Sequence, residues 1–283
     1  MQKDIYLSRI NSEQRPLVMG ILNITPDSFS DGGCFIDPQS ALLQASKMLK
    51  DGADIIDLGG ESTRPGAGPV DSKEQLRRIL PVMNLLRSSL SIDCLLSVDT
   101  TQSNVAEKAL QAGVDIVNDI SAGLHDPRMF SMVAERSVPI VLMHMQGTPF
   151  TMQNNPVYTN VVEEVAEFLI RRAELAEKTG IKRENIILDP GIGFGKRQID
   201  NLKLIAQIRR IVDIGYTVLL GTSRKRFMGS ICGEKEAVEL LGATIATTVY
   251  GVEQGVKIFR VHDVKPNRQA VDVTVNLMRN RIE

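Results

Sequence analysis

Residues 95–117 read LLSVDTTQSNVAEKALQAGVDIV, and they already indicate the fold class. An aliphatic run at 95–98 is followed by polar residues and then by residues 104–112, whose apolar side chains recur at helical spacing. Gly113 stands where such a helix would end, and a second aliphatic run begins at Ile116. Two short strands joined by a helix predict a parallel pair, because parallel strands need a long crossover connection.

The same alternation continues along the whole chain. We expect strands at 17–22, 55–58, 95–98, 116–117, 139–143, 186–188, 217–220 and 257–261. We expect helices at 41–50, 74–88, 104–112, 127–136, 160–179, 202–214, 238–253 and 265–279. Eight β/α repeats predict a (β/α)₈ TIM barrel, with residues 1–16 as an extension that closes its bottom. A doubly wound open sheet is the alternative.

Length and composition agree with one α/β domain over residues 1–283. A chain of 283 residues buries a large core without disulfides or a structural metal. Two segments rich in proline and glycine, 25–33 and 63–69, each follow a predicted strand, so neither is a linker between domains. We therefore expect a single domain.

Charge and cysteine content exclude several kinds of partner. The 33 basic and 34 acidic residues leave a net charge of −1, which favours neither nucleic acid nor an anionic membrane. The three cysteines are far apart, as in a reduced protein without a thiolate metal site. No run of 18 apolar residues is present, and the first residues carry no apolar export signal. We expect a cytoplasmic protein with small-molecule substrates and no nucleic-acid or membrane partner.

Several segments resemble well-known motifs but lack residues that those motifs require. The segment DPGIGFGK at 189–196 resembles a phosphate loop, but Pro190 stands where the pattern needs glycine and Arg197 where it needs a hydroxyl. The segment GTSRK at 221–225 lacks the last glycine of a nucleophile elbow. None of the three histidines forms a zinc-type pair. The segment 189–196 also has only one residue between Gly193 and Gly195, so it misses the dinucleotide fingerprint. These failures argue against a nicotinamide enzyme, a serine hydrolase and a zinc hydrolase.

Polar residues stand at the carboxyl ends of nearly all predicted strands, where the active sites of such barrels lie. One set can donate hydrogen bonds to phosphate oxygens: Thr63, Arg64, Arg260 and His262. A second set combines carboxylates, an amide and an ammonium: Asp99, Asn118, Asp189 and Lys225. This second set matches a flat heterocycle that presents donors and acceptors along its edge.

These residues lie in longer motifs that span essentially the whole chain. The motifs are MGILNITPDSFSDGG (19–33), GGESTRPG (59–66), SVD (97–99), NDI (118–120), LMHM (142–145), LDPGIGFGK (188–196), GTSRK (221–225) and RVHDV (260–264). In content and order they resemble the dihydropteroate synthase family. The resemblance implies a homodimeric (β/α)₈ barrel that joins 6-hydroxymethyl-7,8-dihydropterin diphosphate to 4-aminobenzoate, releases diphosphate and is the target of sulfonamides.

The resemblance also implies a role for each motif residue. The pterin-binding residues would be Asp99, Asn118, Asp189 and Lys225. The diphosphate-binding residues would be Asn23, Thr63, Arg64, Arg260 and His262, with Asn23 as a ligand of Mg²⁺. The aminobenzoate-binding residues would be Phe29, Thr63, Pro65, Phe194, Arg224 and Arg226. The residues that carry catalysis would be Asp99, Lys225, Arg260 and His262, acting on a bond that breaks before the arylamine attacks.

The sequence departs from the family pattern at one position, and two alternative functions compete with this interpretation. Arg226 stands where some relatives have serine, so we expect backbone N–H groups at the following helix to contact the benzoate carboxylate. A methyltetrahydrofolate–corrinoid methyltransferase would share Asp99, Asn118 and Asp189 but has no use for Lys225 or the phosphate-binding set. An inactive binding module would not need both sets. His144 is interpreted as a core histidine outside the site, and Glu61 and Asp263 as groups that orient their neighbours.

Overall fold

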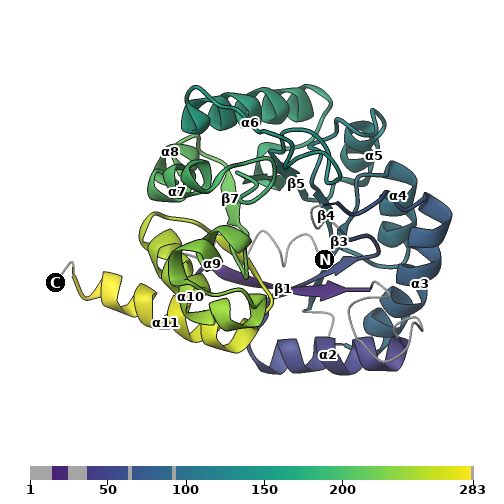
Figure 1. Ribbon diagram of the computed structural model, residues 1–283. Helices are drawn as coiled ribbons and strands as arrows, with labels where there is room; N and C mark the ends of the chain where they lie inside the picture. Colours follow the sequence, from purple (N-terminus) through teal and green to yellow (C-terminus); the bar gives the residue numbers. More distant parts are fainter. Residues whose placement is uncertain (1–14, 25–36, 63–65, 91–93, 282–283) are drawn as a thin grey trace.

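The computed structural model describes residues 15–24, 37–62, 66–90 and 94–281, and its centre is a closed barrel of eight parallel strands (Figure 1). The strands are β1 (Leu17–Asn23), β2 (Ile55–Gly59), β3 (Leu95–Asp99), β4 (Ile116–Asp119), β5 (Ile140–Met143), β6 (Ile186–Asp189), β7 (Thr217–Leu220) and β8 (Ile258–Val261). Strand β1 pairs with β2 on one side and with β8 on the other. This closure confirms the TIM barrel and excludes the open sheet.

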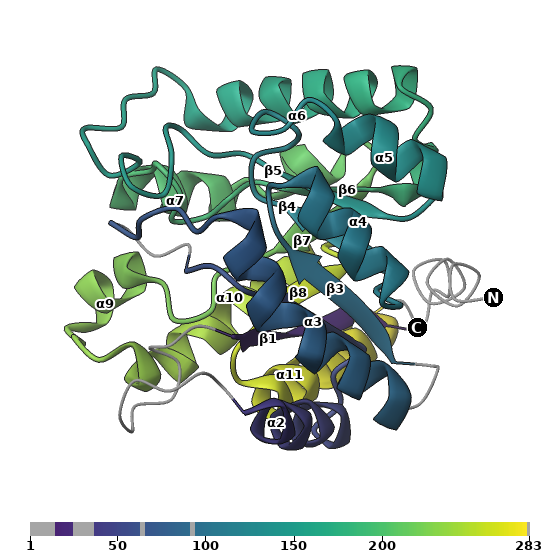
Figure 2. The ribbon, with the colours of Figure 1, turned by 90° about the vertical axis from the view of Figure 1, so that its right-hand side faces the viewer.

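Helices surround the strands on all sides (Figures 1 and 2). They are α2 (Pro38–Lys50), α3 (Ser72–Ser89), α4 (Ser103–Gln111), α5 (Met129–Arg136), α6 (Val161–Lys178), α7 (Gln198–Ala206), α8 (Arg209–Val212), α9 (Arg226–Cys232), α10 (Leu241–Glu253) and α11 (Val264–Arg279), with 3₁₀ turns η2 (Arg183–Asn185) and η3 (Ala237–Leu240). Among the described residues, no helix has the length and hydropathy needed to cross a bilayer.

Two helices differ from the sequence-based expectation. The helix expected at 202–214 begins earlier and is broken at Gln207, where the backbone leaves the helical region, so α7 and α8 are separate. Helix α9 was not expected, because seven residues are too few to show an amphipathic period. It ends at Gly233, whose φ of 74° is left-handed, as is common after a helix.

The interior of the barrel follows the two-residue period of a β-strand. Its apolar floor consists of Leu17, Met19, Ile55, Leu95, Ile116, Val141, Ile187, Leu219 and Ile258. Two residues further along β2, β4, β6 and β8, the inward positions are Asp57, Asn118, Asp189 and Arg260. The same alternation that fills the floor with aliphatic side chains therefore directs polar side chains into the barrel above it.

The beginning of the described chain is fastened at the bottom of the barrel, close to Asp54, which precedes β2. Val18 N donates to Asp54 Oδ2 at 2.9 Å, and the Arg268 guanidinium donates to Pro16 O at 3.0 Å and to Asp54 Oδ2 at 3.2 Å. Residues 1–14 of the extension expected to close the bottom lie outside the described residues.

Candidate active site

Arg260 of β8 crosses the mouth of the barrel and joins strands that are distant in sequence. Its Nε donates to Asp57 Oδ2 of β2 at 2.7 Å, and an Nη donates to Asp99 Oδ2 of β3 at 2.8 Å. Asp57 Oδ2 also accepts from Asn118 Nδ2 of β4 at 3.0 Å. A guanidinium, two carboxylates and an amide from four strands thus form one hydrogen-bonded network at the carboxyl ends of the strands.

Burial and mutual attraction set the ionisation of this network. Burial raises the pKa of Asp99 to about 7, while the positive charge of Arg260 opposes the rise. Burial alone would lower the pKa of Arg260, but the adjacent carboxylates of Asp57 and Asp99 outweigh it, so the pKa is raised. The guanidinium therefore remains charged within the barrel.

Asp57 is a central site residue that the sequence-based reasoning missed. It is fully buried in the strand sequence IIDLG, and its Oδ1 has no hydrogen-bond partner among the described residues. The signal was present, because an acid two residues after Ile55, in an otherwise apolar strand, must face the barrel interior. What the strand could not show is its partner, since Arg260 lies 203 residues away.

Lys225 and Asp189 lie on the β6 and β7 side of the same end of the barrel. The Lys225 ammonium is 4.2 Å from the centre of the Phe194 ring, within cation–π range. Burial and the positive charge of Arg260 lower the pKa of Lys225 to about 8, against the attraction of Asp189 and Asp99. Asp189 Oδ1 accepts from Gly191 N at 2.7 Å, and burial raises the pKa of this carboxyl. The pair offers a heterocycle one cationic donor and one acceptor.

The loop after β6 is held in place by a buried lysine. Lys196 Nζ donates to Gly191 O at 2.9 Å and to Phe194 O at 3.0 Å, and it lies 2.9 Å from His144 Nδ1. His144 is buried, as expected for a core histidine, and its ring stacks edge-on against Phe168 at 4.9 Å. It is nevertheless linked to the site, because it contacts the cation that fixes the loop carrying Phe194.

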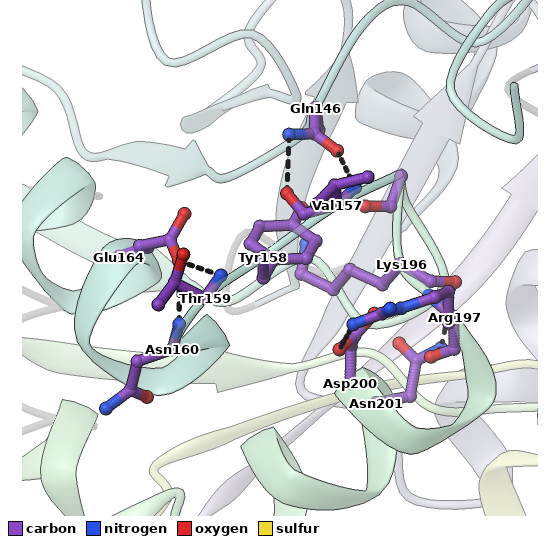
Figure 3. Close-up of polar contacts among 11 residues, drawn as sticks. Gln146, Val157, Tyr158, Thr159, Asn160, Glu164, Lys196, Arg197, Asp200 and Asn201 are labelled. Atoms are coloured by element: carbon purple, nitrogen blue, oxygen red, sulfur yellow. Dashed lines mark hydrogen bonds and ion pairs between the residues drawn. The ribbon is translucent and has the colours of Figure 1, made fainter. Parts of the chain in front are cut away.

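The neighbouring loop, residues 144–160, packs against the same segment (Figure 3). Tyr158 Oη donates to Gly195 O at 2.7 Å, beside the Lys196 side chain. Gln146 accepts from Val157 N at 3.1 Å, which closes the loop on itself. The two loops after β5 and β6 therefore form one hydrogen-bonded unit on this side of the site.

The loops after β7 and β8 are joined in a similar way. Ser223 Oγ lies 3.0 Å from His262 Nδ1 and accepts from His262 N at 3.1 Å. The Arg224 guanidinium makes two hydrogen bonds to the Asp263 carboxylate, at 3.0 and 2.7 Å. Burial and the positive charge of Arg224 lower the pKa of His262 to about 3. The imidazole is therefore neutral at physiological pH.

Asn23, for which the family resemblance implies a contact with Mg²⁺, lies at the end of β1. Its Oδ1 lies 3.6 Å from the position of a Cβ built on Gly59, next to the tips of β2 and β3. The described residues contain no group of three His, Cys, Asp or Glu side chains arranged to hold a metal. An amide oxygen without a protein cage suits Mg²⁺, which is often bound through substrate phosphates and water.

The described part of the chain brings most of the predicted site residues to one end of the barrel. Those at strand ends or in the loops that follow are Asn23, Asp99, Asn118, Asp189, Phe194, Lys225, Arg260 and His262. Arg224 is engaged with Asp263, and Arg226 is exposed as the first residue of α9. Phe29, Thr63, Arg64 and Pro65 lie outside the described residues, and all individual ligand contacts remain predictions.

Comparison with known proteins places this arrangement in a family. The family model described as "Pterin binding enzyme" matches residues 19–262. A dihydropteroate synthase of Synechocystis is 44% identical over 266 residues, which cover 94% of this chain and 91% of that protein.

Two solved structures agree with the sequence comparison. A Clostridium difficile dihydropteroate synthase, determined in the presence of pteroic acid, superposes with a TM-score of 0.88 at 42% identity and covers 95% of this chain and 99% of that one. A Xanthomonas albilineans dihydropteroate synthase with 4-aminobenzoic acid has a TM-score of 0.87 at 40% identity, with 93% of each chain covered. The chain therefore belongs to the pterin-binding enzyme family, as a transferase of the dihydropteroate synthase type.

Proposed function

We propose that this enzyme joins 6-hydroxymethyl-7,8-dihydropterin diphosphate to 4-aminobenzoate with the help of Mg²⁺ and forms 7,8-dihydropteroate and diphosphate. The observation that carries the proposal is the cation of Arg260, fixed by Asp57 and Asp99 at the mouth of a barrel whose other walls carry Asp189 and Lys225. One end of the barrel thus holds groups for a pterin edge and a cation for the group that leaves.

The pterin ring would lie between the ends of β3, β4, β6 and β7. Asn118 uses its Nδ2 on Asp57, which leaves its Oδ1 as an acceptor for a ring donor. Asp99 and Asp189 supply carboxylate oxygens, and Lys225, with a pKa of about 8, is mostly an ammonium at pH 7 and donates to the ring carbonyl. Donors and acceptors alternate, as the edge of a pterin requires.

The diphosphate would lie toward β1 and β8. Two nitrogens of Arg260 bind the carboxylates, and the remaining Nη1 has no partner among the described residues, so it can donate to a phosphate oxygen. The neutral imidazole of His262 can donate one further hydrogen bond, and Asn23 Oδ1 can hold Mg²⁺. The metal would neutralise charge on the leaving diphosphate. Thr63 and Arg64 complete the predicted set.

The reaction would begin with loss of the leaving group. The bond between the CH₂ carbon and the diphosphate oxygen breaks, and the electron pair stays with diphosphate, beside Arg260 and His262. The positive charge left on the pterin is delocalised into its ring and opposed by the carboxylates of Asp99 and Asp189. The amino group of aminobenzoate, positioned beside Phe194, then forms the C–N bond and loses a proton.

The methyltransferase alternative uses Asp99, Asn118 and Asp189 but gives no role to Lys225. It also gives none to the side of the barrel mouth formed by Arg260, His262 and Asn23. The assembly and location of the enzyme also belong to the proposal. From the family resemblance we infer a homodimer, and from the cysteine content a cytoplasmic enzyme.

A turnover assay tests the proposal directly. Purified enzyme is given the pterin diphosphate, 4-aminobenzoate and Mg²⁺, and dihydropteroate and diphosphate are measured. We expect equal amounts of both products, a large loss of rate when Mg²⁺ is chelated, and competition between 4-aminobenzoate and a sulfonamide of the same shape. Protein that binds the pterin diphosphate yet makes no product at saturating aminobenzoate and Mg²⁺ would refute the proposal.

A further inference from the structure

The hydroxyl oxygen of Ser223 makes two contacts with His262, one with its backbone and one with its ring. The backbone N–H of His262 donates to Ser223 Oγ at 3.1 Å, and the same oxygen lies 3.0 Å from Nδ1 of the His262 ring. A serine hydroxyl has two lone pairs and one hydrogen. The backbone N–H of His262 occupies one lone pair, and the hydroxyl hydrogen still requires an acceptor.

Ser223 is buried, with 4% of the residue exposed, so its hydroxyl hydrogen needs a hydrogen-bond acceptor. Among the described residues, the acceptor in contact with this hydroxyl is His262 Nδ1. If Nδ1 carried a hydrogen of its own, two donors would face the oxygen and the hydroxyl hydrogen would have no partner. The economical arrangement has Ser223 donating to an unprotonated Nδ1.

The charges around the ring favour the same state. Arg224 and Lys225 from the loop after β7, and Arg260 from β8, are cations whose charges lower the pKa of the imidazole, while the anion Asp263 opposes them. Burial and these cations lower the pKa of His262 to about 3, so the ring is neutral. A neutral imidazole has one hydrogen, and an unprotonated Nδ1 places it on Nε2.

We propose that Ser223 is a positioning residue that holds His262 in the tautomer with hydrogen on Nε2, so that this nitrogen donates to an oxygen of the leaving diphosphate. The second part rests on the proposed function, whereas the tautomer itself does not. In the other tautomer, Nε2 would present a lone pair to an anion and repel it. The hydroxyl therefore determines whether the imidazole attracts or repels the leaving group.

The loop that carries Ser223 is itself fixed to the loop that carries the histidine. The next residue, Arg224, has a φ of 58° and makes two hydrogen bonds to Asp263, the residue after His262. Such a left-handed backbone is unfavourable for arginine and persists only where surrounding contacts enforce it. The Arg224–Asp263 pair thus holds the Ser223 hydroxyl at hydrogen-bonding distance from the ring.

The tautomer can be measured in the ligand-free protein. The whole chain has three histidines, so selective ¹⁵N labelling gives few signals, and His125→Gln and His144→Gln variants assign them. We expect His262 to show an unprotonated Nδ1 and a protonated Nε2 at pH 7, and Ser223→Ala to show a mixture of tautomers. A His262 ring with hydrogen on Nδ1 in the wild-type protein would overturn the proposal.

Binding of inorganic diphosphate with Mg²⁺, measured by calorimetry, tests the consequence. We expect Ser223→Ala to weaken binding about tenfold, the scale of one lost hydrogen bond to a charged group, and to lower kcat more than it raises KM. Ser223→Thr keeps the hydroxyl and should restore both the tautomer and most of the affinity. Thr247→Ala, which removes a hydroxyl that contacts Thr222 but not His262, is the matched control and should bind as the wild type does.

The outcomes separate the two proposals. Unchanged tautomer and unchanged diphosphate affinity in Ser223→Ala would overturn the role of Ser223. If the wild-type ring has its hydrogen on Nε2 but the wild-type protein neither binds diphosphate nor turns over, the tautomer assignment stands and the proposed function fails. Equal losses in Ser223→Ala and Thr247→Ala would show a general loosening of the loop and would also overturn the proposal.

Discussion

Individual charged residues in this site are stabilised by very different surroundings, and their removal should have different effects. Lys225 is a cation whose burial is unfavourable, as its lowered pKa of about 8 shows. Arg260 is a cation that two buried carboxylates need, because Asp57 and Asp99 would otherwise face each other without a counter-charge. Activity alone cannot distinguish these two situations, but activity together with stability can.

For Lys225→Ala we expect turnover to fall by at least about a hundredfold, because the proposed donor to the pterin carbonyl is lost. The melting temperature should stay the same or rise, since an unfavourably buried charge is removed. Steady-state kinetics and thermal unfolding measure the two effects. A large loss of stability with little loss of rate would show that Lys225 is a structural residue.

For Arg260→Ala we expect both properties to be lost. Turnover should fall by orders of magnitude, and the free energy of unfolding should drop by about 3 kcal/mol because two buried carboxylates lose their partner. The double variant Asp57→Asn/Arg260→Ala also removes one of the two unpaired carboxylate charges. Relative to Arg260→Ala it should recover part of the stability but none of the activity. Urea unfolding of both variants decides this, and equal stability of the two would contradict the assignment.

His144 makes stability depend on pH. Burial and the neighbouring charge of Lys196 lower its pKa from 6.5 to about 2 in the folded protein, so below pH 6.5 the unfolded chain binds a proton that the folded protein does not. Stability therefore falls as pH falls through 6.5. Between pH 7 and pH 5 this residue should account for a loss of up to about 2 kcal/mol.

The matched experiment compares the wild type with His144→Gln by urea unfolding at pH 7, 6 and 5. The variant should be less stable at pH 7, because Lys196 loses a contact. The stability of the variant should nevertheless decline less steeply as the pH falls. The difference between the two slopes should correspond to about one fewer proton bound on unfolding. His125→Gln, a change at an exposed histidine, is the control and should follow the wild type. Parallel curves for the wild type and His144→Gln would rule out this role.

At the scale of elements, the loops matter more than the strands they follow. The loop after β6 begins with Asp189 and Pro190 and turns through three glycines with positive φ, among them Gly191 at 66°. A Cβ on Gly191 would lie 1.9 Å from His144 O, so no larger residue fits without moving backbone. The loop can approach β5 only because this position is glycine.

Gly191→Ala should therefore lower the free energy of unfolding by about 3 kcal/mol and displace Asp189 and Phe194 enough to reduce turnover. Gly233→Ala is the matched control, because Gly233 has a similar φ of 74° but open space where its Cβ would be. It should cost only about 1 kcal/mol for the backbone strain and leave turnover unchanged. If both variants lose the same stability, the close approach at Gly191 is unimportant.

Sequence patterns predicted the elements that recur and missed those that do not. All eight strands were placed correctly, because each is a short apolar run followed by polar residues. Helix α9 and the break between α7 and α8 were missed, because α9 and α8 are too short for a repeating apolar pattern to be recognised in the sequence.

The site shows the same division between local and long-range information. Asp99, Asn118 and Asp189 follow their strands and could be identified one by one. The pairing of Asp57 with Arg260 and the contact of Lys196 with His144 join residues 203 and 52 positions apart, and no local pattern carries such information.

At the scale of the whole molecule, the family resemblance predicts an assembly of two chains. Light scattering and sedimentation should give twice the 31.2 kDa mass of one chain at micromolar concentration. A mass of one chain across the concentration range would contradict the homodimer.

The closure of the barrel between β1 and β8 has a consequence for the order of events during synthesis. Arg260 is made 203 residues after Asp57 and 161 after Asp99, so the anionic half of the network exists on the ribosome long before its cation. The nascent chain cannot complete the ring, or gather its catalytic groups, until β8 has left the exit tunnel. A chain cut short before residue 258 lacks the last strand and the guanidinium together, so premature termination yields neither a closed barrel nor the complete network of Asp57, Asp99 and Arg260.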